Sequence, residues 1–181
     1  MNILRIDRNN QVNGEGLRDV IWCAGCNHHC PFCQNPEAQN PANGTAYGPW
    51  VLRLLGEDLK RKEIRGVTFS GGEATYPANR EETTRLMAWI KKNYPEKTIW
   101  VYTGYLYEEI QDLPMMDYVD VLVDGPYVQS LNPGPNKLFW RGSKNQRVID
   151  VPATRKAGSV VWLKGFSGKP IDEEEKEAGI D

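Results

Sequence analysis

The chain has 181 residues, of which 40% are hydrophobic and 25% charged, and its formal net charge is −2. This length predicts one domain that buries roughly 70% of its unfolded surface. The composition excludes a disordered chain, a collagen-like fibre and a long coiled coil. The near-neutral charge offers no general attraction to nucleic acid or to an anionic membrane, so we expect neither as a partner.

No apolar stretch approaches the roughly 20 residues that a membrane-spanning helix needs. Residues 1–11 alternate apolar and charged side chains and lack the apolar core of a signal peptide. We therefore expect a cytoplasmic protein with reduced thiols.

Strand and helix patterns alternate between residues 17 and 124, which predicts an α/β fold. The first helix is expected to begin at Pro49, because proline suits the first turn and Val51, Leu55 and Leu59 follow at helical spacing. The remaining expected elements are strands at residues 20–22, 66–70, 98–103 and 119–123, and helices at residues 77–92 and 108–113. The nearly continuous apolar strands favour a parallel sheet.

Beyond residue 137 the pattern changes to apolar runs without helices between them. We expect strands at residues 138–140, 147–151 and 159–163, packed as a short antiparallel C-terminal extension. Residues 167–181 contain six acids and two lysines and predict a solvated tail, so the folded domain is expected to span residues 1–166.

All four cysteines lie within the eleven residues 23–33, a spacing that predicts a metal site in a reduced compartment. A structural zinc site usually takes two cysteine pairs that are farther apart, whereas iron–sulfur clusters accept compact runs. Cys26, Cys30 and Cys33 follow the spacing C-x3-C-x2-C. Three thiolates leave one iron of a four-iron cluster open to a small molecule.

The other polar residues of this segment have two interpretations each. Cys23 follows a predicted strand, and we expect a small buried residue rather than a fourth cluster ligand. His28 and His29 could ligate a metal or carry protons, but exposed loop positions are the expectation.

The pattern C-x3-C-x-aromatic-C, completed by Phe32, resembles the signature of the radical S-adenosylmethionine (SAM) enzymes. A second motif, Ser-Gly-Gly-Glu at residues 70–73, follows a strand, where consecutive glycines let the backbone approach a ligand. The resemblance implies that Gly71, Gly72 and Glu73 bind the methionine amino group of SAM and that Phe32 also contacts the cofactor. The alternative for residues 70–73 is an ordinary turn with an exposed glutamate.

Two further strands end in a polar residue, Thr103 and Asp124, each followed by glycine. Active sites of parallel barrels lie at the carboxyl ends of the strands. The resemblance implies that both residues face the ribose or methionine part of SAM. Ordinary turn chemistry is the alternative.

Several segments narrow the resemblance to the activating enzymes of glycyl radical proteins, and among these to the activating proteins of anaerobic (class III) ribonucleotide reductases. They are residues 13–18, 33–36, 100–105, 120–128 and 140–147. The resemblance implies a [4Fe-4S] cluster that reductively cleaves SAM with an electron from a flavodoxin-like donor. The resulting 5′-deoxyadenosyl radical takes hydrogen from a glycine of the partner reductase. No catalytic residue beyond the cluster ligands is implied.

About five parallel strands cannot close an eight-stranded barrel of roughly 250 residues, so we expect an incomplete, open (β/α) barrel of the radical SAM type. Its open side would admit the glycine loop of the partner. Arg18 and Arg141 are expected at the rim as docking residues, with surface salt bridges as the alternative. Three other functions stay open: a radical SAM enzyme for a small molecule, an activase of another glycyl radical enzyme, and a non-catalytic iron–sulfur or zinc module.

Overall fold

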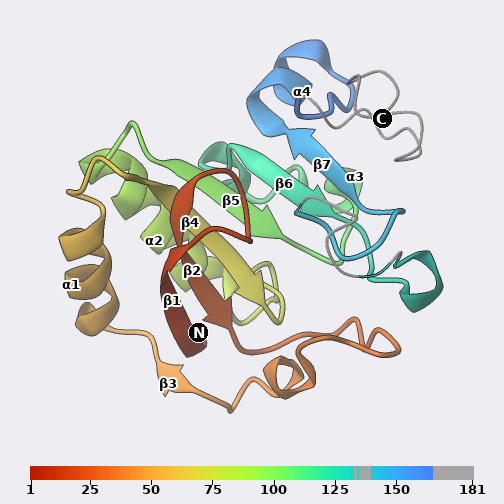
Figure 1. Ribbon diagram of the computed structural model, residues 1–181, viewed down its shortest axis with the longest axis horizontal. Helices are drawn as coiled ribbons and strands as arrows, with labels where there is room; N and C mark the ends of the chain where they lie inside the picture. Colours follow the sequence, from red (N-terminus) through yellow and green to blue (C-terminus); the bar gives the residue numbers. More distant parts are fainter. Residues whose placement is uncertain (133, 135–139, 165–181) are drawn as a thin grey trace.

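The computed structural model describes residues 1–132, 134 and 140–164 (Figure 1). These residues form one open seven-stranded sheet with the order β3-β1-β2-β4-β5-β6-β7. Its strands are β1 (Asn2–Asn10), β2 (Leu17–Cys23), β3 (Thr45–Ala46), β4 (Ile64–Gly71), β5 (Thr98–Tyr102), β6 (Val121–Asp124) and β7 (Arg147–Asp150). The α/β class and the open sheet agree with the expectation.

The four α-helices of the described residues are α1 (Pro49–Asp58), α2 (Arg80–Asn93), α3 (Tyr107–Ile110) and α4 (Val151–Ala157). Short 3₁₀ helices lie at Pro36–Gln39, Pro114–Asp117 and Gln129–Leu131. As expected, α1 begins at Pro49 and buries Val51 and Leu55. The described part of the chain contains no helix that is long and apolar enough to cross a membrane.

Four neighbouring strands, β2, β4, β5 and β6, run parallel, one fewer than the expected number of about five. The strands β1 and β7 pair antiparallel at the two sides of this group. The carboxyl ends of the four parallel strands therefore meet at one edge of the sheet. The loop between β2 and β3, drawn in orange in Figure 1, runs along this edge, where Gly72 N donates to Cys23 O at 2.8 Å and Glu73 N to Gly25 O at 2.8 Å.

The two faces of the sheet differ because side chains alternate along each strand. On one face, Phe69, Val101 and Leu122 belong to the main hydrophobic core, together with buried residues of α1 and α2. On the opposite face, Trp100, Val121 and Val123 form a smaller cluster. Helices thus cover one face near the parallel strands, and the other face is available to line a cavity.

The C-terminal part differs from the expectation in two respects. The expected strand at residues 147–151 is present as β7, but it leads into α4, since Asp150 caps the helix by accepting from Ala153 N at 2.9 Å. Gly158 ends α4 with φ +69°. The expected strand at residues 159–163 is reduced to a single antiparallel bridge between Ile149 and Trp162. Residues 138–139 and the expected tail at residues 167–181 lie outside the described residues.

Candidate functional site

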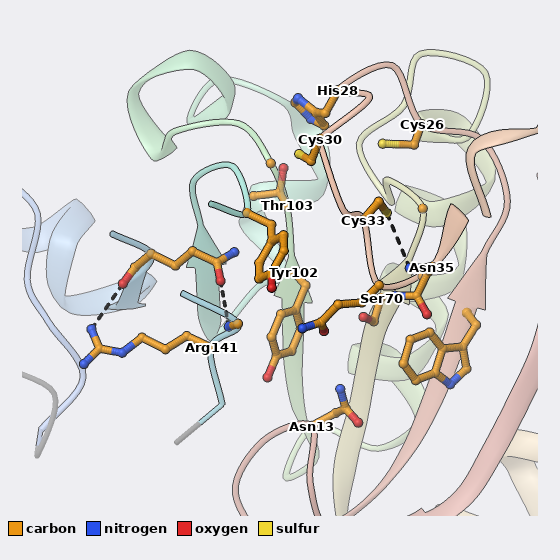
Figure 2. Close-up of a pocket in the computed structure, with 18 of the residues that line it drawn as sticks. Asn13, Cys26, His28, Cys30, Cys33, Asn35, Ser70, Tyr102, Thr103 and Arg141 are labelled. Atoms are coloured by element: carbon orange, nitrogen blue, oxygen red, sulfur yellow. Dashed lines mark hydrogen bonds between the residues drawn. The ribbon is translucent and has the colours of Figure 1, made fainter. Parts of the chain in front are cut away.

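A cavity of about 660 Å³ lies at the carboxyl ends of the parallel strands (Figure 2). Its lining includes strand ends at Ser70 and Tyr102, and segments that are far apart in the chain, such as Asn13 and Arg141. A cavity of this size accommodates a cofactor or a substrate segment. The position at the carboxyl ends of parallel strands is where α/β folds place their ligands.

The thiols of Cys26, Cys30 and Cys33 all belong to the wall of this cavity. All three are free cysteines with partly exposed side chains. Burial raises the pKa of the Cys26 thiol, and Asn35 N donates to Cys33 Sγ at 3.4 Å. Among the described residues, no three His, Cys, Asp or Glu side chains converge on the position of a single metal ion. An iron–sulfur cluster takes one thiolate at each of several iron corners, so its ligands need not converge on one point.

Cys23 lies outside the cavity lining and is fully buried. Burial raises the pKa of its thiol to about 12, and its Sγ lies 3.6 Å from Met1 Sδ. The structure therefore places Cys23 in the core, as expected for a small buried residue.

Gly71 and Gly72 also line the cavity, on the side of the cysteine loop. Gly71 has φ +99°, which favours glycine. A Cβ atom on Gly72 would lie 2.6 Å from the carbonyl oxygens of Gly25 and Ala38. These glycines therefore bring the end of β4 directly against the backbone of the cysteine loop.

Glu73 is completely buried, so the interpretation as an exposed glutamate in a turn is wrong. Its Oε1 accepts hydrogen bonds from the backbone N and the Oγ1 of Thr75, at 3.0 and 2.7 Å. Its Oε2 accepts from Thr103 Oγ1 at 3.0 Å, from Gly104 N at 2.9 Å and from His28 Nε2 at 2.9 Å. The carboxylate thus connects the ends of β4 and β5 with the cysteine loop.

The structure corrects the expected exposure of His28, whose side chain is only 17% exposed. His28 lines the cavity and packs edge-on against Tyr105, with ring centroids 4.4 Å apart. His29 is exposed, as expected, and its Nδ1 lies 3.4 Å from Gln39 Oε1. No local signal separates the two adjacent histidines, so sequence reasoning missed the role of the first.

The remaining candidate residues are divided between the cavity and other surroundings. Thr103 lines the cavity and is buried beside Glu73. Asp124 is buried outside the lining, where it accepts from Arg147 Nε at 2.9 Å and from Tyr107 N at 2.7 Å. The hydrogen bond to Asp124, and after it the one to Glu108, raises the pKa of Arg147, so Asp124 has a structural partner. The expected contact of Asp124 with SAM stays a prediction. Phe32 is 78% exposed and is also absent from the lining.

Arg18 is not at the rim, which corrects its expected position. Its side chain is 1% exposed, and its guanidinium donates to Thr68, Thr98, Glu15 and Val67 beneath the segment that precedes β2. Arg141 does line the cavity, is 9% exposed and donates from Nη1 to Gln146 O at 3.2 Å (Figure 2). Only Arg141 therefore lies where the docking hypothesis placed both arginines.

Comparisons with known proteins agree with this site. The family model of the 4Fe-4S single cluster domain matches residues 12–149. The chain is 43% identical over 148 residues to the anaerobic ribonucleoside-triphosphate reductase-activating protein of Enterobacteria phage T4, covering 82% of this chain and 93% of the relative. The proteins of the same name from Haemophilus influenzae and Escherichia coli K12 are 35% and 36% identical, over 81% and 76% of this chain and 96% and 90% of theirs. The chain belongs to the family of anaerobic ribonucleoside-triphosphate reductase-activating proteins, which carry a 4Fe-4S domain.

Proposed function

We propose that this protein is an activase that generates a glycyl radical on an anaerobic ribonucleoside-triphosphate reductase. The observation that carries the proposal is the shared cavity, because Cys26, Cys30 and Cys33 line it together with Gly71 and Gly72. The names of the relatives supply the partner. In this proposal the open sheet, with helices on one face and the cavity at its strand ends, is an incomplete radical SAM barrel.

The three thiols would hold the [4Fe-4S] cluster, and partly exposed cysteines that line one cavity are the donor set that such a group takes. When bound, the cluster would supply the electron for cleavage of SAM to methionine and a 5′-deoxyadenosyl radical, and this radical would take a hydrogen atom from the partner's glycine. The chain itself binds and orients these groups and keeps water from the radical. A flavodoxin-like protein is the proposed electron donor.

Gly71 and Gly72 are proposed to present backbone atoms to the amino acid part of SAM. Glu73 lies directly behind them, but both of its oxygens already accept hydrogen bonds from the chain. A direct bond from the SAM ammonium to Glu73 therefore requires that one of these donors withdraw. Thr103 belongs to the same site through its bond to Glu73.

The cavity lining also fits a glycine loop as the protein substrate. Within the part of the chain that the structure describes, the lining contains no aspartate, glutamate or lysine, and Arg141 is its one permanently charged side chain. A loop with little side chain can enter such a cavity without leaving a carboxylate or ammonium unpaired. The opening at the strand ends gives that loop a route to the cysteine wall.

The test is to incubate the reconstituted protein with SAM, a reductant and a class III reductase, and to record the electron paramagnetic resonance spectrum. We expect the doublet of a glycyl radical, and we expect none from a Cys30→Ala control. Cleavage of SAM without a radical on the reductase would favour a small-molecule substrate or another glycyl radical enzyme. A protein without iron and sulfide would leave only a non-catalytic zinc module, and a protein with both that does not cleave SAM would leave a non-catalytic iron–sulfur module.

A further inference from the structure

We propose that His28 is a positioning residue that fastens the cysteine loop to the buried Glu73 carboxylate. The inference rests on the proposed function only for its consequence at the cluster, since the contacts themselves belong to the folded chain. His28 lies between two of the three cluster-ligand cysteines, Cys26 and Cys30. A residue at this position that is held from outside the loop fixes the direction of both thiols.

Three contacts from two parts of the chain hold the imidazole of His28. Its Nε2 donates to Glu73 Oε2 at 2.9 Å, behind the end of β4. The edge of the ring meets Tyr105, with an angle of 69° between the two planes. The third contact is with Gly104, where a Cβ atom would lie 2.5 Å from His28 Cδ2.

Asn27 adds a second attachment of the same loop. Its Nδ2 donates to Tyr105 Oη at 2.8 Å, and that hydroxyl lies 3.2 Å from Asn27 Oδ1. Both attachments therefore reach the segment that follows β5. Of the two attachments, the one through the His28 imidazole is the buried one, because Asn27 is exposed and the His28 side chain is largely covered.

Gly104 gives this inference a specific structural test. All three of the nearest atoms to an added Cβ belong to the His28 ring. Gly104 does not have a positive φ, so its backbone accepts alanine. A methyl group at this position displaces the imidazole, and these three close contacts are absent when the imidazole has been removed.

The experiment is a double-mutant cycle of His28→Ala and Gly104→Ala in the full chain before cluster assembly. The readout is the rate at which Cys26, Cys30 and Cys33 are alkylated, followed by mass spectrometry. The buried Cys23 in the same molecules reports global opening. His29→Ala is the matched control, because His29 is the adjacent, exposed histidine.

We expect each single variant to accelerate alkylation of the three loop thiols about tenfold, the factor for losing one hydrogen bond to a charged group. The double variant should be alkylated at the same rate as His28→Ala. The alkylation rate of Cys23 should not change in any variant, and the loop thiols of the His29→Ala control should react at the wild-type rate. His28→Gln keeps an N–H donor and should restore slow alkylation. The proposal would be overturned if Gly104→Ala accelerated alkylation of the loop thiols equally with and without His28. It would also be overturned if His28→Ala and His29→Ala changed the alkylation rate by the same factor.

A second readout uses the cluster-loaded protein. If the loop is displaced, the electron paramagnetic resonance signal of the reduced cluster should respond less to added SAM in His28→Ala than in His28→Gln. An identical response in the two variants would show that His28 does not position the cluster. Failure of the proposed activase function leaves the alkylation results unaffected, so the two failures are distinguishable.

Discussion

Replacement of Arg18 by alanine is expected to destabilise the protein strongly, because Arg18 is a buried structural residue. Its Nη2 donates to the carbonyl oxygens of Val67 and Thr98 at 3.0 and 2.8 Å, and its Nε to Thr68 Oγ1 at 2.9 Å. The guanidinium carbon also lies 5.3 Å from the centre of the Trp100 ring. Burial lowers the pKa of Arg18 to about 10, so the group stays protonated at neutral pH.

The expected loss follows from the acceptors that the truncation leaves behind. A buried hydrogen-bond acceptor without a partner costs about 1–3 kcal/mol. The carbonyl oxygens of Val67 and Thr98 each lose the hydrogen bond that Arg18 donates to them. The threonine hydroxyls recover part of their bonding, since Thr68 Oγ1 donates to Asn13 O at 2.7 Å. We therefore expect Arg18→Ala to lower the free energy of unfolding by about 4 kcal/mol. An exposed arginine in a salt bridge would lose only about 0–1 kcal/mol.

The assay is urea denaturation followed by circular dichroism, with Arg53→Ala as the control. Arg53 is exposed on α1, and its replacement should change the free energy of unfolding by less than about 0.5 kcal/mol. Arg18→Lys should give an intermediate loss, because one ammonium cannot reach all the acceptors. A loss below about 1 kcal/mol for Arg18→Ala would refute the reasoning, because it would match a surface arginine.

Three further predictions concern the cysteines, Asp124 and Asp19. Cys30→Ala should abolish the iron and sulfide content of the reconstituted protein, whereas Cys23→Ala should leave both largely intact; loss of the cluster in Cys23→Ala would show a fourth ligand. Asp124→Ala leaves its arginine partner without that carboxylate and should lower the free energy of unfolding by about 3 kcal/mol. Unchanged stability together with weaker SAM binding would instead support the expected contact of Asp124 with the cofactor. Burial, and to a smaller extent Asp58, raise the pKa of Asp19 from 3.8 to about 7. Folding therefore favours the protonated acid, and the stability that Asp19 contributes below pH 3.8 is lost as the pH rises to about 7. In denaturant titrations, Asp19→Asn should therefore stabilise the protein more at about pH 8 than at about pH 4.

Much of the site was predictable because short motifs depend on local spacing. The C-x3-C-x2-C run places Cys26, Cys30 and Cys33 on one loop whatever the rest of the chain does. The glycines at residues 71–72 follow an apolar strand, so their position at a strand end could be read directly. The parallel group of strands was predictable for the same reason, since each strand carries its own apolar pattern.

The C-terminal part shows where this local reading ends. The strand was expected to extend to Val151, because Val148, Ile149 and Val151 are β-branched, and no helix was expected after it. Asp150 accepts from Ala153 N and begins a helix there, a short-range cap that the apolar pattern obscured.

The amino-acid sequence by itself determined which residue types the site contains, their order and the strands that carry them. Only the tertiary structure decided their partners. Glu73 accepts hydrogen bonds from residues 30, 31 and 45 positions away, and Arg18 donates to Thr98, 80 positions away. These partners meet because the sheet brings distant strand ends together, and burial then leaves each charged group only the donors or acceptors that lie beside it. His28 and Glu73 are linked for that reason, and no spacing in the chain records it.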